Sequence, residues 1–165
     1  TGHGDSCRYG YSFVSKKYKQ FKYLMQIDSD NQCDPKYFVS FYNLIKNKRG
    51  DFIFGNRKTR KDGYARLLIS KLLSGTFFLK KFIYIKDLNT PYRLMKTEKV
   101  RKILYNIKKN NKSSIHLFNC VLTYEIVKIY KIIWIDINFR DRKYGKSKFN
   151  LLKMFYMYLN FFLKI

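Results

Sequence analysis

The chain has 165 residues, of which 46% are hydrophobic and 19% aromatic, so it is too apolar to be disordered and long enough for one domain with a buried core. Its 35 lysines and arginines outnumber its 11 aspartates and glutamates and give a formal net charge of +24. This excess favours anionic partners, namely nucleic acid, an acidic membrane surface or phosphate-bearing small molecules. A general compositional bias toward lysine is an equal alternative.

Cysteine usage and the apolar segments exclude further classes. Cys7, Cys33 and Cys120 are odd in number and far apart, which fits neither a disulfide framework nor a Cys-x-x-Cys metal site, so we expect reduced thiols in an intracellular protein. The first residues carry no signal-peptide pattern, and no apolar run reaches the roughly 20 residues of a membrane-spanning helix. Because the chain begins Thr-Gly-His-Gly without a methionine, we expect it to be a piece of a longer protein.

The first half of the chain predicts alternating helices and strands. Residues 5–17 have apolar residues at helical spacing and end in two lysines, which predicts a helix. Residues 22–27 predict a strand, and residues 35–48 predict a second helix with a proline at its start. Residues 51–55 predict a short buried strand, and residues 56–63 a polar, basic loop.

The second half continues this alternation. In chain order it predicts a helix over 65–80, a loop leading into a short strand over 85–95, a basic amphipathic helix over 97–108, a buried helix over 117–130, a strand over 131–139, a basic loop over 140–148 and an apolar segment over 149–165. Strands that alternate with helices of about 10–15 residues predict an α/β fold with a mostly parallel sheet flanked by helices.

Oxygen-bearing side chains follow the first predicted strand at alternate positions, as Asp28, Asp30 and Gln32. Alternate residues of an extended chain point the same way, so the three side chains can converge on one point. Their oxygens suit a hard cation such as Mg²⁺ or Mn²⁺, and ligands of open α/β sheets bind at the carboxyl ends of strands. The alternative is that Asp-Ser-Asp only fills a turn and caps the helix that begins at Pro35.

Four segments resemble, in order, the landmarks of family 2 glycosyltransferases with a GT-A fold: DSDNQCDP, FGNRKTR, DLNTPYRLM and INFRDRKYGKSK. The likeness is closest to the branch that contains the dolichyl- and polyprenyl-phosphate sugar synthases. The opening TGHGDSCRYGYSFVSK is similar to the Gly-rich stretch that precedes the DxD strand in that family. The resemblance implies a GT-A-like domain, truncated at its N-terminus, whose C-terminal portion is residues 1–148. The βαβ unit that reads the nucleotide would lie upstream, so the isolated fragment is expected to be inactive or nearly so.

The resemblance also implies roles for individual residues. Asp28 and Asp30 would hold a divalent cation on the donor diphosphate, with Gln32 as a third ligand. Basic residues would meet the donor or acceptor phosphates, namely Arg57, Arg66, Arg142 and Lys146. Asp87 matches an acidic position near the reaction centre and would be the catalytic base for a sugar hydroxyl, whereas a lipid phosphate is already an anion and needs no base.

These assignments predict a metal-dependent, inverting glycosyltransferase that moves a sugar from a nucleotide-sugar donor to a polyprenyl-phosphate or glycan acceptor. We expect it in the cytoplasm, at the cytoplasmic face of a membrane, with no nucleic acid as partner. An alternative from another class is a basic α/β module that binds nucleic acid through its lysines and interleaved tyrosines. A third is a degenerate remnant that folds poorly.

Several residues outside these motifs have plainer predictions. Residues 149–165 predict an apolar helix that lies on a bilayer, closes the domain or begins a membrane-spanning segment. His3 and His116 lack metal-ligand spacing and are predicted to be structural. Glu125 is predicted to pair with a nearby lysine.

Overall fold

The computed structural model describes residues 2–60, 75, 78, 83–110, 112, 117–140, 156, 157, 159–161 and 163. The helices among them are α1 (His3–Lys17), α2 (Tyr37–Lys46), α4 (Thr97–Lys109) and α5 (Phe118–Val127). The strands are β1 (Tyr23–Ile27), β2 (Phe52–Arg60), β3 (Tyr92–Lys96) and β4 (Ile132–Phe139). The predicted helix over 65–80 and the basic loop beyond residue 140 lie, wholly or almost wholly, outside the described residues.

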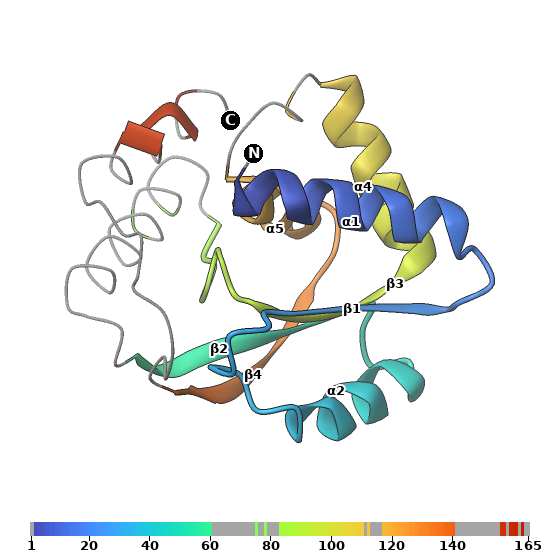
Figure 1. Ribbon diagram of the computed structural model, residues 1–165, viewed down its shortest axis with the longest axis vertical. Coiled ribbons are helices and arrows are strands. Elements are labelled where there is room, and N and C mark those ends of the chain that lie inside the picture. The colour runs from blue at the N-terminus through green and yellow to red at the C-terminus, as the bar shows by residue number, and fades with distance from the viewer. Residues whose placement is uncertain are drawn as a thin grey trace.

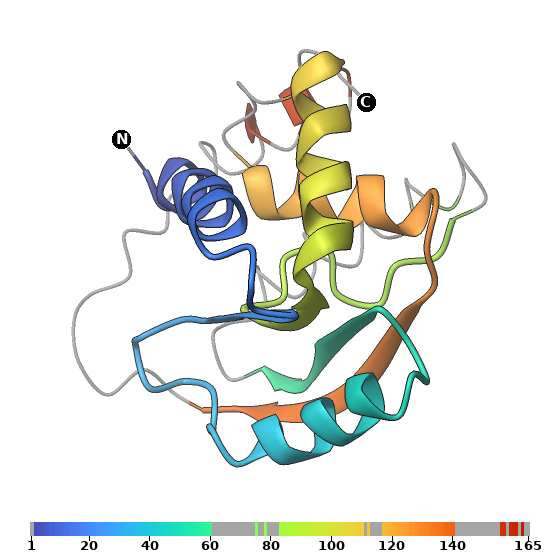
Figure 2. The ribbon, with the colours of Figure 1, turned by 90° about the vertical axis from the view of Figure 1, so that its right-hand side faces the viewer.

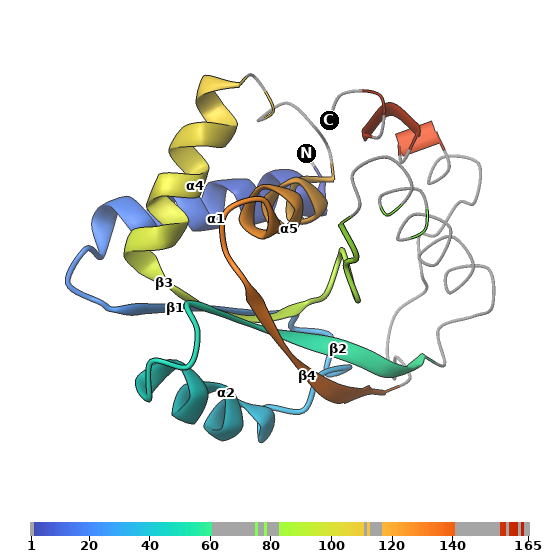
Figure 3. The same cartoon turned by 180° about the vertical axis from the view of Figure 1, so that it is seen from behind.

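The strands form one sheet in the order β1-β3-β2-β4 (Figures 1 and 3). β3 runs antiparallel to both of its neighbours, and only β2 and β4 are parallel. The fold is α/β as predicted, but the prediction of a mostly parallel sheet is wrong, because the sheet is mixed. The reason is where the chain re-enters the sheet: Asp87 contacts Arg57 near the carboxyl end of β2, so the strand that follows must run back in the opposite direction.

Helices cover both faces of this sheet. α1, α4 and α5 lie on one face and α2 lies on the other (Figure 2). Successive side chains of β2 point to opposite faces of the sheet. Phe52 and Phe54 therefore pack in the core under α1, α4 and α5, and Ile53 packs in the core over α2. α2 contributes Phe41 and Ile45 to its core, one helical turn apart and fully buried.

Most predicted elements within the described ranges are confirmed, with one extension. Residues 56–60 were expected to be loop, but they continue β2 and pair with β4 from Asn56 opposite Asp136 to Arg60 opposite Phe139. The predicted buried helix is confirmed, since every residue of α5 from Phe118 to Ile126 is buried. Glu125 on this helix pairs with Lys112, whose Nζ lies 2.7 Å from the carboxylate, and with Lys128 at 3.2 Å, as predicted.

The C-terminal segment is described at a few positions only. Phe161 is fully buried and packs in the core shared with α1, α4 and α5, whereas Tyr156 and Leu163 are exposed. This packing favours the alternative in which the segment closes the domain. Within the described ranges, no helix combines the length and the apolar character needed to cross a bilayer.

Candidate functional site

Asp28 and Asp30 lie just beyond the carboxyl end of β1, as the alternating pattern predicted. Together with the first turns of α1 and the last residues of β1, they line a cavity of about 420 Å³. Burial raises the pKa of the Asp28 carboxyl above its ordinary value, and the negative charge of Asp30 adds to the rise. The charges of His3 and Arg57 and a hydrogen bond from Gln26 oppose it. The cavity therefore holds two interacting carboxylates, one of which is poorly solvated.

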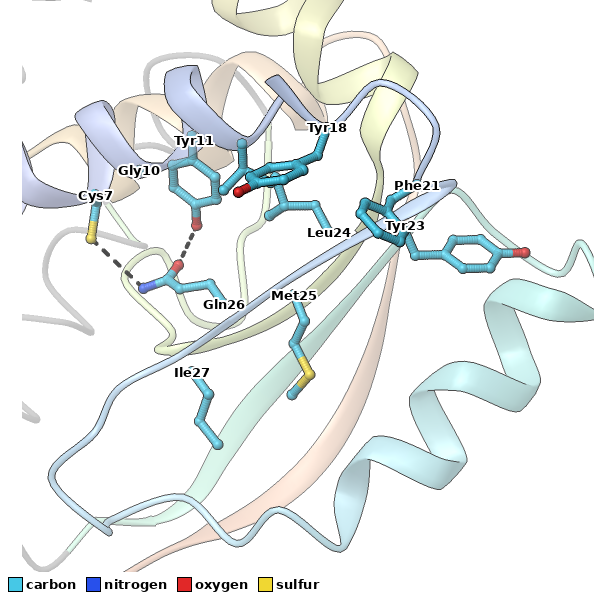
Figure 4. Close-up of a pocket in the computed structure, with 11 residues that line it drawn as sticks. Cys7, Gly10, Tyr11, Tyr18, Phe21, Tyr23, Leu24, Met25, Gln26 and Ile27 are labelled. Atoms are coloured by element: carbon cyan, nitrogen blue, oxygen red, sulfur yellow. Dashed lines mark hydrogen bonds between the residues drawn. The ribbon is translucent and has the colours of Figure 1, made fainter. Parts of the chain in front are cut away.

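A polar chain inside the fold orients Asp28. Gln26 lies two residues before it on the same side of β1, and its Nε2 donates to Asp28 Oδ1 at 3.4 Å. The hydroxyl of the buried Tyr11 donates to the amide oxygen of Gln26, and the same Nε2 lies 3.9 Å from Cys7 Sγ (Figure 4). Burial raises the pKa of the Tyr11 hydroxyl, so it remains a hydrogen-bond donor. α1 thus holds the first carboxylate in place through Gln26.

His3 belongs to the same cavity, although it was predicted to be structural. Its Nε2 lies 3.5 Å from Cys7 Sγ, and this contact, followed by the charges of Cys7 and Asp28, raises the pKa of the imidazole against the opposing effect of burial. The sequence signal that could have found it is its place in the Gly-rich opening directly before the DxD strand, since His3 has no ligand spacing to other residues.

Gln32 is tied to the end of β4. Its Nε2 donates to the carbonyl oxygen of Arg140 at 3.0 Å, and the Arg140 N–H donates to the Gln32 carbonyl at 2.9 Å. The predicted third ligand is therefore buried and bonded to the end of β4, and it does not line the cavity that Asp28 and Asp30 share. Asp30 Oδ1 accepts the N–H of Gln32 at 3.3 Å, and Asn31 has a φ of 61°, so the loop is also the tight turn of the alternative interpretation.

Arg57 and Asp87 were predicted separately, as a phosphate-binding residue and a catalytic base, and they form one bidentate ion pair. Arg57 Nε and Nη2 donate to the two carboxylate oxygens of Asp87 at 2.6 and 2.8 Å, and Nη2 also donates to the Asn89 carbonyl at 3.1 Å. The guanidinium lies 5.1 Å from the ring centre of Phe139. A register shift between Arg57 and Thr59 marks a bulge here, a feature that redirects side chains at sheet rims.

These charged residues gather around one buried thiol. Burial raises the pKa of Cys33 to about 12, and the charges of Asp28, Asp30 and Asp87 add to the rise while Arg57 opposes it. The backbone of Cys33 forms an isolated antiparallel β-bridge with that of Phe139 at the end of β4. The described part of the predicted site therefore lies at one end of the sheet. The other predicted basic residues, Arg66, Arg142 and Lys146, lie outside the described residues.

The donor set fits a hard divalent cation that is shared with a ligand. Two carboxylates that disfavour each other's charge would both be stabilised by Mg²⁺ or Mn²⁺, which typically takes one or two protein carboxylates and completes its shell with water and phosphate. In the described part of the chain, no three His, Cys, Asp or Glu side chains are grouped to hold a metal. A cation at Asp28 and Asp30 would thus depend on a phosphate-bearing ligand for further oxygens.

No model of a known protein family matches this chain. A search of curated proteins finds no match either. The function of the chain is therefore inferred from its own residues and their arrangement.

A second, mostly apolar cavity of about 530 Å³ adjoins the first. It lies between α1 and β1, and its lining includes Tyr11, Tyr18, Phe21 and Leu24 (Figure 4). β1 is the edge strand of the sheet as described, so this cavity runs along an open strand edge. The two cavities share Cys7, Gln26 and Ile27 in their linings, so the apolar cavity leads to the carboxylates.

Proposed function

We propose that this chain is the catalytic and acceptor portion of a metal-dependent, inverting glycosyltransferase with a GT-A-like fold, which uses a nucleotide-sugar donor. One observation carries the proposal: Asp28 and Asp30 follow the end of β1 at the same end of the sheet as the Arg57–Asp87 pair, because β1 and β2 both run antiparallel to β3. The ordered motifs described above support it independently.

The residues have complementary tasks in such a reaction. Asp28 and Asp30 hold a divalent cation, which when bound neutralises charge on the diphosphate leaving group. Gln26 keeps the first carboxylate oriented, and Arg57, held by Asp87, places positively charged donors at the same end of the sheet. Preorganised donors of this kind stabilise charge where it develops in the transition state. Asp87 holds the guanidinium in its orientation through two hydrogen bonds.

The Arg57–Asp87 pair favours a polyprenyl phosphate over a glycan hydroxyl as the acceptor. A hydroxyl acceptor needs a base that it can reach. Both oxygens of Asp87 accept hydrogen bonds from Arg57, and its side chain is only 3% exposed. A lipid phosphate is already anionic and needs no base.

Thermal unfolding with Mn²⁺ and a panel of sugar nucleotides tests the proposal. A ligand at a hundredfold excess over its Kd stabilises by about 2.7 kcal/mol, so we expect the melting temperature to rise by about 5–11 °C with metal and donor together and by less with either alone. Asp28→Asn and Asp30→Asn should abolish this gain. Glu98→Gln, which removes one exposed charge at the start of α4, is the matched control and should keep it.

Retention of the full shift in both aspartate variants would contradict the proposal. The nucleic-acid alternative predicts a different pattern, namely steeply salt-dependent binding of an oligonucleotide that is indifferent to Asp28→Asn. Activity is then assayed as transfer of a labelled sugar to a polyprenyl phosphate, with the full-length enzyme.

A further inference from the structure

A basic groove of about 520 Å³ lies between α1 and α4, on the face of the sheet opposite α2 (Figure 2). We call it the α1–α4 groove. Four cationic side chains line it, namely Arg8 and Lys16 of α1 and Arg101 and Lys108 of α4. None of the described residues that line it carries a carboxylate. The groove is separate from the candidate site, whose cavity is lined by the start of α1, the end of β1 and the loop that follows.

The charges of this groove are largely uncompensated. Among the ion pairs of the described residues, only Arg8 has a partner, and its contact with Asp5 is long at 3.7 Å and solvent-exposed on both sides. An exposed pair of this kind contributes little to stability, so Arg8 is readily available to another anion. Lys16, Arg101 and Lys108 form no ion pair with other described residues. The described part of the groove is therefore positively charged.

Its floor is apolar, which restricts the kind of anion that fits. Leu104, Ile107 and Phe118 form this floor beneath the cations. Ile107 and Phe118 are each only 1% exposed, so the accessible part of this floor is Leu104. An anion with an apolar body next to its charge would fill such a groove better than a free phosphate or a sugar-phosphate backbone.

Exposed aromatic residues extend the surface beyond the groove. Tyr105 lines the groove and is 67% exposed. On α1, Tyr9 is 70% exposed and stacks on Phe13, with ring centres 5.9 Å apart. Lys17 lies 5.2 Å from the centre of the Phe13 ring. Tyrosine rings combined with basic side chains are typical of surfaces at the headgroup level of a membrane.

We propose that the α1–α4 groove and the adjoining outer side of α1 bind the headgroup layer of an anionic phospholipid bilayer. Lys16, Arg101 and Lys108 contact the lipid phosphates, and the first carbons of an acyl chain pack on Leu104. The exposed tyrosines lie at the level of the headgroups. A lipid is favoured over nucleic acid because an acyl chain can pack on Leu104, whereas a sugar-phosphate backbone has no such apolar part. This inference goes beyond the proposed transfer reaction and does not depend on it.

Vesicle flotation of the full chain, without metal or sugar nucleotide, tests the inference. One vesicle preparation is phosphatidylcholine alone, and the other is an equimolar mixture of phosphatidylcholine and phosphatidylglycerol. The test variant is Lys16→Gln/Lys108→Gln, two exposed lysines of the groove. The matched control is Lys46→Gln/Arg49→Gln, which removes the same charge from exposed positions at the end of α2, on the other face of the sheet.

We expect the native chain to float with the mixed vesicles and not with pure phosphatidylcholine. Each cation near an anionic surface changes the partition coefficient about 5-fold, so the test variant should lose roughly 30-fold and the control only a few-fold. Equal losses in the two variants would overturn the inference, because binding would then follow net charge alone. Two results together would overturn the inference in favour of nucleic acid. A single-stranded oligonucleotide would displace the protein from the vesicles, and the test variant would bind that oligonucleotide more weakly than the control does. Circular dichroism of both variants verifies that they are folded.

Discussion

Asp87→Asn is expected to destabilise the fold strongly, because it removes the partner of a nearly buried guanidinium. Arg57 is 11% exposed and Asp87 3%, and two charge-assisted hydrogen bonds join them at 2.6 and 2.8 Å. Removing one member of a buried ion pair typically costs about 3–5 kcal/mol. Partial access of water to Arg57 and its remaining bond to the Asn89 carbonyl reduce this cost, so we expect a loss of about 3 kcal/mol in the free energy of unfolding.

Equilibrium unfolding in urea, applied as a double-mutant cycle, measures this loss. Arg57→Met and the double variant complete the cycle, and we expect a coupling free energy of about 2 kcal/mol. Asp51→Asn is the matched control, since Asp51 lies 2.6 Å from Lys96 but both side chains are 28% exposed, which predicts a loss of at most about 1 kcal/mol. Similar small losses in the two aspartate variants, with no coupling between Arg57 and Asp87, would refute the reasoning that burial makes the pair important.

Three further predictions concern the sheet, the carboxylates and the core. Gly55→Ala would place a Cβ 2.6 Å from Ile137 Cδ1, so urea unfolding should show a loss of about 1–3 kcal/mol that Ile137→Val partly relieves. The folded-state pKa of Asp28 is raised, so this residue stabilises the fold fully at pH values below its unfolded-state pKa near 3.8. That stabilisation is lost as the pH rises through the folded-state pKa. Asp28→Asn should therefore remove this decline from a plot of melting temperature against pH. Phe41→Ala, at a fully buried position, should cost about 3–5 kcal/mol in unfolding free energy, whereas Phe38→Ala, at 41% exposure, should cost less than about 1 kcal/mol.

Much of the fold could be predicted from local patterns. Helical periodicity located α1, α2, α4 and α5 to within a few residues, because each helix turns a set of apolar side chains toward the sheet or, in α5, is buried all round. The direction of β3 could not be predicted, since it depends on the end of the sheet at which the chain returns. The length of β2 was also missed, because polar residues extend it where β4 offers partners, as in the 2.7 Å hydrogen bond from Asn56 to Asp136.

The candidate site was predictable where its residues are close in sequence. Asp28 and Asp30 follow a strand at alternate positions, and their location at its end is confirmed. The Arg57–Asp87 pair and the bond from Gln32 to Arg140 join residues 30 and 108 positions apart. Local spacing carries no information on such contacts, so the site residues were identified one by one while their pairing was not.

The parallel pairing of β2 with β4 has a consequence for how the chain folds. It unites residues as far apart as Asn56 and Asp136, which are 80 positions apart, so a long loop must close before the two strands can exchange hydrogen bonds. Non-local pairing of this kind slows folding. The contacts of Phe139 with Arg57 and Cys33 form only after that closure. Partly folded chains will therefore contain local helices before they contain an assembled site.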